Sequence, residues 1–288
     1  MADRESQFPY EVSDLKDLPE RFQQAAQPLL KPVEPITSIL MLPPQPFLGR
    51  RGVPRQALLS TAQGILHIRD GQPPTATYLH GESLLYVHYT LVLLYNRLEL
   101  AGEVNGRLVH IVIEYNTVGQ HLVEIMLTQF LYLTYGMAQP VASIREQNDA
   151  LLQKLETESF KFMNGLRHYA LQRGERLLGY VYQPRIKQPL LHFFNRPIAP
   201  SSLLALTDKA VILIEEEKVG GPSYGWVITL CLRKVVETVE SRSNREWRNI
   251  CIHLARNSVA LDRQVMMEND KALDVESLWS SPKQSDDK

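Results

Sequence analysis

Alternation of apolar and polar positions along the chain predicts mostly antiparallel strands. In the segment 106–115, Val109, Ile111 and Ile113 recur at every second position, as in a strand with one face buried. The run 83–101 is longer than a typical strand, so we expect two strands or one strongly bent strand there. The turn residues expected to close the following hairpin are Gly102, Asn105 and Gly106.

Helical periodicity interrupts this pattern in several places. A short helical patch covers 20–26, and a long helix is expected within 139–173, where Ser143 and Glu146 have the spacing of a capping box and Gly174 ends the pattern. Two further helices are expected to follow the last strands near 118–133 and 259–273. The apolar stripes expected on these three helices are Ile144, Leu151, Leu155, Phe162, Leu166 and Tyr169; Val118, Leu122, Ile125, Met126 and Leu133; and Val259, Leu261, Val265, Met266 and Leu273.

The hydrophobic pattern occurs twice along the chain. Segment 61–70 (TAQGILHIRD) aligns with 207–216 (TDKAVILIEE), 146 residues further on. The same element order with different loop lengths is therefore predicted for two copies of one unit. Two further alignments join 106–115 to 245–254, at an offset of 139, and 45–46 to 183–184, at an offset of 138.

A chain of 288 residues has room for two such units. Each copy is expected to begin where the first aligned strand begins and to end with its helix. The predicted organisation is an N-terminal arm (1–33), a first domain (34–138), a linker helix (139–173), a second domain (174–280) and a disordered tail (281–288).

Each copy is expected to run as a short strand, several antiparallel strands with a central hairpin, and a closing helix, which resembles the pleckstrin-homology-like (PH-like) superfold. Segments 174–184 and 203–216, and 37–46 and 58–70 in the first copy, are similar to the bacterial branch of that family. The Gly-Glu opening of that branch is present at 174–175 and absent from the first copy. The resemblance implies an α+β fold of two strongly bent antiparallel sheets or partial barrels, each capped by a C-terminal helix. It does not imply one function, because such folds bind lipids, bind peptides or act as scaffolds.

Composition excludes some classes of function. The 31 basic and 32 acidic residues give a net charge of −1, whereas nucleic-acid binding depends on basic charge that neutralises phosphates. The most apolar run, 122–137, carries Glu124 and Gln129, so no membrane-spanning segment is predicted. The N-terminus shows no export signal. Because Cys231 and Cys251 lie in apolar strand patterns, we expect buried thiols in a reducing, cytoplasmic setting.

Basic residues in the first loop of each copy are the candidate binding residues. Neither 47–58 nor 184–203 contains an acidic residue, so each loop is expected to form a local positive patch on a neutral protein. By resemblance to family members that bind phosphoinositides, such a patch would bind anionic lipid headgroups; the alternative is a solvated loop. The candidates are Arg50, Arg51, Arg55, Arg185, Lys187 and Arg196.

Catalytic and metal-binding patterns are absent from the sequence. His67, His88 and His110 lie on expected strands, but no zinc-type spacing of His or Cys supports a metal site. There is no nucleophile elbow, phosphate-binding loop or dinucleotide loop. The sequence therefore predicts neither an enzyme nor a cofactor.

The central strands are apolar on both faces, for example at Leu230, Cys231 and Leu232 and along 91–94. Such a sheet needs a cover on its second face. The linker helix is favoured because its own stripe needs a partner, while the other copy and a second chain, as in a homo-oligomer, stay as alternatives. These features favour a non-catalytic protein-interaction or assembly module that docks a partner segment at a sheet edge or beside the closing helix. The alternative is a peripheral binder of anionic lipids.

Overall fold

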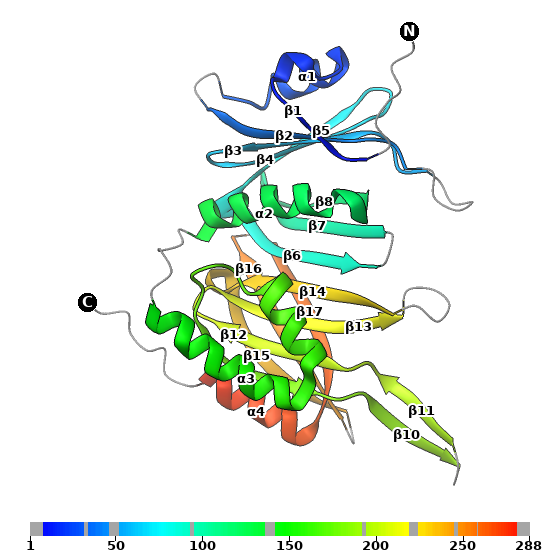
Figure 1. The fold of residues 1–288 in the computed structure, drawn as a ribbon, viewed down its shortest axis with the longest axis vertical. Coiled ribbons are helices and arrows are strands. Elements are labelled where there is room, and N and C mark those ends of the chain that lie inside the picture. The colour runs from blue at the N-terminus through cyan, green and yellow to red at the C-terminus, as the bar shows by residue number, and fades with distance from the viewer. Residues whose placement is uncertain are drawn as a thin grey trace. The chain divides into compact units, whose positions relative to one another are not determined.

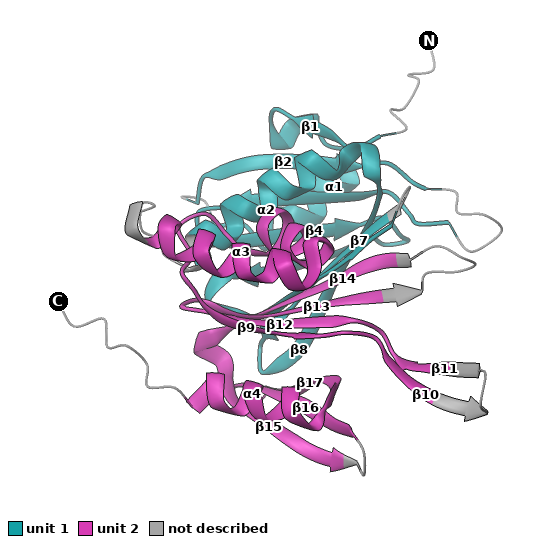
Figure 2. Cartoon of the chain, turned by 60° about the horizontal axis from the view of Figure 1, so that its bottom comes forward, with its two compact units in different colours: residues 1–137 teal, residues 138–288 magenta. Residues whose placement is uncertain are grey.

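Antiparallel sheets and four α-helices make up the described part of the chain, so the predicted α+β class is confirmed. In the computed structural model the chain divides into unit 1, residues 1–137, and unit 2, residues 138–288 (Figure 2). Within the described residues no sheet closes into a barrel, and no helix is long and apolar enough to cross a membrane. The structure describes residues 8–31, 34–45, 52–92, 95–135, 142–191, 194–218, 224–244, 247–257 and 259–280.

Unit 1 contains a five-stranded antiparallel sheet in the order β1-β2-β3-β4-β5, followed by an antiparallel meander of three strands, β6, β7 and β8 (Figure 1). Its strands are β1 (Tyr10–Val12), β2 (Ile36–Leu42), β3 (Gln56–Thr61), β4 (Gly64–Arg69), β5 (Thr75–His80), β6 (Leu84–Leu91), β7 (Tyr95–Val104) and β8 (Arg107–Asn116). Its helices are α1 (Glu20–Ala26) and α2 (Gln120–Tyr135), with a 3-10 turn, η2 (Gly81–Ser83), between β5 and β6.

The expected division of 83–101 into two strands is confirmed by β6 and β7. The hairpin between β7 and β8 turns at Asn105 and Gly106, whose φ angles are 52° and 73°. A two-residue turn of this type needs positive φ at both central positions, which Asn-Gly adopts at little cost. Local sequence therefore fixes this hairpin.

The N-terminal arm covers one face of the first sheet. Helix α1 has the predicted bounds, and its Phe22 is fully buried in a cluster with Leu59 and Leu66 of the sheet. The guanidinium of Arg21 donates to Asp70 Oδ2 at 2.7 Å. The arm thus supplies the cover that a sheet with two apolar faces requires.

Unit 2 contains a four-stranded sheet in the order β14-β13-β12-β9, a separate hairpin of β10 and β11, and a meander of β15, β16 and β17. Its strands are β9 (Leu177–Gln183), β10 (Ile186–Leu191), β11 (Phe194–Ala199), β12 (Ser202–Thr207), β13 (Ala210–Lys218), β14 (Tyr224–Leu232), β15 (Val236–Asn244), β16 (Trp247–Arg256) and β17 (Val259–Glu268). Its helices are α3 (Ala142–Gly165) and α4 (Asn269–Ser280), with a 3-10 turn, η5 (Arg233–Val235), before β15.

The predicted linker helix is present as α3, but the backbone of Ser159 is extended (φ −160°, ψ 100°) and bends it into two arms. Phe162 in the second arm contacts the rings of Tyr182 and Trp226, at 5.1 Å between centroids in each case. Lys161 forms an ion pair with Glu216 of β13. The second arm of α3 therefore covers the sheet of unit 2, as the apolar pattern of the linker favoured.

The prediction of a helix near 259–273 is wrong for most of these residues. Residues 259–268 form β17, which pairs with β16 along ten residues, and the helix begins at Asn269. Burial along β17 tends to alternate, with Val265 and Met267 buried and Gln264 exposed. Apolar residues four apart fit a period of two as well as a helical turn, and the ladder with β16 decides between them.

The two units repeat one element order, but the alignment of 106–115 with 245–254 is wrong. Residues 106–115 lie on β8, whereas 245–254 fall mainly on β16, which follows η5 and β15 as β7 follows η2 and β6. The counterpart of β8 is therefore β17. Neighbouring strands of a meander share the same alternation, so a pattern match alone does not identify the strand.

Strand register corrects a second alignment and confirms a third. The ladder between β2 and β3 leaves Thr37 without a partner, because Ser38 pairs with Ser60 and Ile36 with Thr61. The ladder between β9 and β12 leaves out Leu178 in the same way, because Gly179 pairs with Leu206 and Leu177 with Thr207. When these two irregularities are matched, equivalent residues of β3 and β12 are 146 apart in the sequence, as predicted. Equivalent residues of β2 and β9 are 141 apart, not the predicted 138. This register makes Glu34 the equivalent of Glu175, so the first copy has the acidic residue of the Gly-Glu opening but has Val33 in place of the glycine.

Candidate functional site

The basic residues expected in the first loops are not brought together within the described chain. Arg50 and Arg51 lie outside the described residues, and Arg55 is half-buried just before β3. In unit 2, Arg185 donates to Glu216 Oε2 at 3.2 Å, and that carboxylate already pairs with Lys161. Arg185 is therefore held in an ion-pair network of its own unit, in which it shares one carboxylate with Lys161.

Lys187 and Arg196 are exposed on the hairpin of β10 and β11, which extends away from the other strands of unit 2 (Figure 1). Lys187 pairs with Pro197, whereas Arg196 pairs with Gln188. Residues directly opposite each other share a face, and neighbours along a strand alternate. The two basic side chains therefore belong to opposite faces of the hairpin.

The three histidines considered for a metal also separate. His67 is buried, its Nε2 lies 2.7 Å from Gln56 Oε1, and burial lowers its pKa to about 4, so the ring is neutral at physiological pH. His88 and His110 lie instead on the face of β6, β7 and β8 that carries Glu99. No group of three His, Cys, Asp or Glu residues in the described ranges has a metal-binding arrangement.

Glu99 is the centre of a polar cluster that the sequence did not reveal. Tyr86 Oη donates to Glu99 Oε1 at 2.5 Å, His110 Nδ1 lies 2.9 Å from the same oxygen, and Arg97 donates to Oε2 at 2.7 Å. Burial by itself raises the pKa of Glu99, but the bonds from Tyr86 and His110 and the charge of Arg97 lower it to about 2. Both carboxylate oxygens are engaged, as in a structural anchor.

An acid–threonine contact recurs in both units beside the turn that follows β3 or β12. In unit 1, Thr61 Oγ1 donates to Glu34 and accepts the backbone N–H of Gly64 at 3.0 Å. In unit 2, Thr207 Oγ1 donates to Glu175 and accepts the N–H of Ala210 at 2.8 Å. The hydroxyl thus satisfies turn donors that would otherwise lack partners.

Burial gives the two acids opposite properties. Glu175 is 1% exposed, and burial raises its pKa to about 7 despite the bonds from Thr207 and from the Gln172 N–H. Glu34 is less buried; burial also opposes its ionisation, but hydrogen bonds from Thr61 and Tyr78 lower its pKa below the usual value. In the same contact, the carboxyl of Glu175 in unit 2 therefore favours the protonated, neutral form, whereas the carboxylate of Glu34 in unit 1 stays charged.

The two thiols are buried, as expected. Cys231 is fully buried, which raises its pKa to about 12, and burial also raises the pKa of Cys251. Both are free cysteines. Nucleophilic chemistry needs the thiolate, which these environments disfavour.

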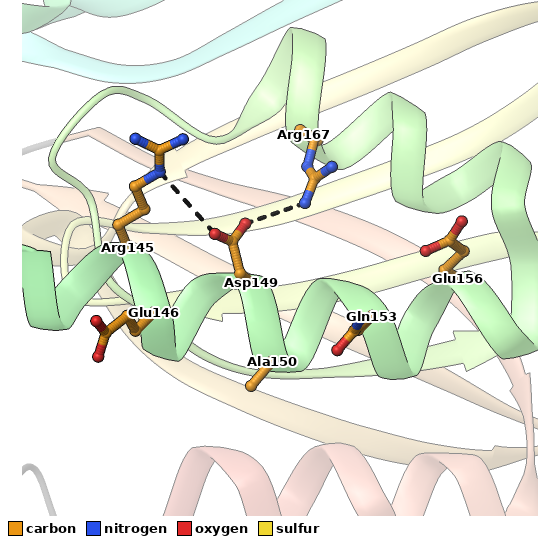
Figure 3. Close-up of a pocket in the computed structure, with 7 residues that line it drawn as sticks. All are labelled: Arg145, Glu146, Asp149, Ala150, Gln153, Glu156 and Arg167. Atoms are coloured by element: carbon orange, nitrogen blue, oxygen red, sulfur yellow. Dashed lines mark hydrogen bonds and ion pairs between the residues drawn. The ribbon is translucent and has the colours of Figure 1, made fainter.

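A groove of about 850 Å³ lies between the first arm of α3 and the turn that follows its second arm (Figure 3). The guanidinium of Arg167 lies 3.0 Å from Asp149 Oδ1, and Arg145 Nε lies 4.0 Å from Asp149 Oδ2, so two basic side chains share one carboxylate in the groove. This arrangement ties the two arms of the bent helix. The groove is lined by Arg145, Glu146, Asp149, Ala150, Gln153, Glu156 and Arg167.

The stripe predicted for the helix after β8 is confirmed at Met126, which is buried, and is wrong at Val118 and Ile125. Val118 and Ile125, expected in the core, are 68% and 43% exposed, and Tyr132 is 50% exposed. Ile125 and Tyr132 are seven apart and lie in one line along α2. Val118 lies just before them, in the 3-10 turn Thr117–Gly119 that precedes the helix. We call these three exposed apolar side chains the α2 stripe. The buried residues are Val123, Met126, Leu127, Phe130 and Leu131.

Two smaller hollows accompany the first sheet. One, of about 380 Å³, follows β2 past the end of β1, along Ile36–Ser38. The other, of about 310 Å³, lies beside the end of α2; we call it the η2 pocket. It is lined by Ala62, Gln63, His80, Gly81, Glu82, Phe130 and Thr134.

The sequence matches no model of a known protein family and no curated protein. Function is therefore argued from the residues of the chain itself.

Proposed function

We propose that this chain is a non-catalytic protein-interaction or assembly module built from two PH-like units. In the described residues, each unit runs as four strands, a 3-10 turn, three strands and a helix: β2 to α2 in unit 1, and β9 with β12 to α4 in unit 2. Helix α4 lies against β9 and β15, and Leu278 approaches Gly179 so closely that a Cβ there would be 2.6 Å from Leu278 Cδ1. These contacts support a helix that closes a bent sheet.

The observation that carries the proposal is the α2 stripe. Large apolar side chains gathered on an exposed surface mark an interaction site, and α2 contains one charged residue, Glu124, between Gln120 and Tyr135. Each large apolar side chain removed from water is worth about 1.5–3 kcal/mol. The spacing of Val118, Ile125 and Tyr132 suits a helix of a partner protein laid along α2.

Charged substitutions on the stripe test the proposal. A photo-crosslinking amino acid at position 132 first captures the partner in the cells that make the protein, and the purified partner is then titrated. The double variant Ile125→Lys, Tyr132→Lys is expected to bind at least about tenfold more weakly, because lysine ammonium groups resist burial. The control Gln24→Lys, Gln27→Lys adds the same charge to exposed positions of unit 1 and is expected to leave affinity unchanged. Equal losses in both variants, or no crosslink specific to position 132, contradict the proposal.

A second candidate is binding to anionic lipid surfaces through the hairpin of β10 and β11. It is favoured by the exposure of Lys187 and Arg196 in a segment without acidic residues. Each basic residue near such a surface contributes about 1 kcal/mol, and the two lie on opposite faces of the hairpin, so the one of Lys187→Gln and Arg196→Gln that removes the membrane-facing charge is expected to weaken vesicle binding about fivefold. Flotation at low salt with and without phosphatidylserine measures this. Absence of binding that depends on the anionic lipid rejects this candidate and leaves the first untouched.

A further inference from the structure

The η2 pocket has a counterpart in unit 2, and the two differ in one residue. The backbone N–H of Gly81 donates to Gln63 O at 2.8 Å, and the N–H of Arg233 donates to Lys209 O at 2.8 Å. Each donor begins the 3-10 turn that follows the fourth strand of the repeat. Arg233 therefore occupies in unit 2 the position that Gly81 occupies in unit 1.

Arg233 fills its position with a guanidinium group. Its Nη1 donates to the carbonyl oxygen of Thr207 at 3.0 Å, at the end of β12. The corresponding residue of unit 1 is Thr61, at the end of β3, where Gly81 supplies no side chain. The hollow of about 310 Å³ in unit 1 therefore lies beside the same turn that a guanidinium group of unit 2 contacts.

Helix α2 prevents unit 1 from filling the pocket in the same way. A Cβ at Gly81 would lie 2.6 Å from Thr134 Oγ1, closer than any ordinary contact. Thr134 and Phe130 instead form one wall of the pocket. Residue 81 therefore cannot supply a cationic side chain to this pocket, and a cation that binds here must come from another molecule.

The remaining walls of the pocket are rich in hydrogen-bond acceptors. Glu82 is exposed at the rim, and the imidazole ring of His80 lines the pocket beside it. Gln63 Oε1 accepts a bond from the ammonium of Lys31 at 3.2 Å, so this side of the pocket already has a cation, and the carboxylate of Glu82 is the group of the lining that can balance a second one. A planar guanidinium has five N–H donors and suits several acceptors arranged around one hollow.

We propose that the η2 pocket binds a guanidinium group. This chemistry is shared by arginine side chains of a partner protein and by free guanidino compounds. Binding rests on the pocket alone and does not require the α2 stripe to have a partner.

Titration of the full chain with matched probes tests the proposal. The probes are agmatine, an arginine with both ends blocked, and the equally blocked citrulline, which keeps the shape of arginine without its charge. Binding is followed by the NMR shifts of the Gly81 amide. Both guanidinium probes are expected to bind at least about tenfold more tightly than the citrulline compound, because charged hydrogen bonds are about twice as strong as neutral ones. Citrulline that binds as tightly as arginine overturns the proposal.

Substitution of Glu82 separates pocket binding from general charge attraction. Glu82→Gln is expected to lower the affinity for the guanidinium probes about tenfold and to leave the affinity for the citrulline compound unchanged. Asp17→Asn removes the same charge from an exposed position of unit 1 outside the pocket and is expected to change nothing. Equal effects of the two variants overturn the proposal. If guanidinium groups do bind, tighter binding of blocked arginine than of agmatine identifies an arginine of a protein as the ligand. Tighter binding of agmatine identifies a free guanidino compound.

Discussion

Replacement of Phe162 by alanine is expected to lower the free energy of unfolding of unit 2 by about 3–5 kcal/mol. The side chain is 1% exposed and lies between the rings of Tyr182 and Trp226, 5.1 Å from each centroid. Alanine would leave a cavity where the second arm of α3 meets the sheet. The result would show how strongly the linker helix is part of the fold.

Urea unfolding followed by tryptophan fluorescence measures this loss, since all three tryptophans of the chain lie in unit 2. Phe160→Ala is the matched control. Phe160 lies two residues earlier in the same arm and is 61% exposed, so its loss is expected to change stability by less than about 0.5 kcal/mol. A similar cost for both variants would show that α3 does not cover the sheet through Phe162.

The stability of unit 2 is expected to fall as the pH rises from about 4.5 to about 7, because of Glu175. Burial raises the pKa of this carboxyl to about 7 in the folded chain, whereas its ordinary value is 4.5. Between these values the folded state holds a proton that the unfolded state has released, so stability decreases with pH. At 1.36 kcal/mol per pKa unit, the total is about 3 kcal/mol.

Glu175→Gln is expected to remove this decrease, because the amide keeps the shape of the neutral carboxyl and does not titrate. The measurement is urea unfolding at a series of pH values. Glu34→Gln changes the equivalent residue of unit 1, whose pKa is lowered, so its contribution is lost only as the pH falls below about 4.5. A wild-type chain that is equally stable at pH 5 and pH 7.5, or a Glu34→Gln variant that abolishes the slope, would contradict the assignment to Glu175.

Sequence patterns predicted elements well where one local rule decides. The bounds of α1, the division of 83–101 into two strands and the Asn105–Gly106 turn are all confirmed. Errors arose where two structures share a pattern. Leu261 and Val265, four residues apart, fit a helix stripe and a strand alike, and β8 resembles β16 because both alternate in the same way.

The candidate sites were less accessible from sequence, because each depends on contacts between distant residues. The Glu99 cluster joins three strands, and the match of Glu34 with Glu175 follows from a skip in the ladder that no residue type indicates. The η2 pocket was missed although Gly81 and Arg233 are both visible in the sequence. Finding it requires the correct strand alignment, which the register supplies.

The sequence by itself determined the α+β class, the repetition and the turns, because alternation, helical period and Asn-Gly chemistry act over a few neighbouring residues. Only the tertiary structure decided which face of each element is covered. Helix α2 exposes Ile125 and Tyr132 beside the polar residues His121, Thr128 and Gln129, so its sequence places a polar side but not the edge of the buried face. Packing within unit 1 sets that edge. Burial depends on contacts between segments far apart in the chain. It also explains why Glu175 and Glu34, which both accept a hydrogen bond from a threonine hydroxyl, differ in pKa.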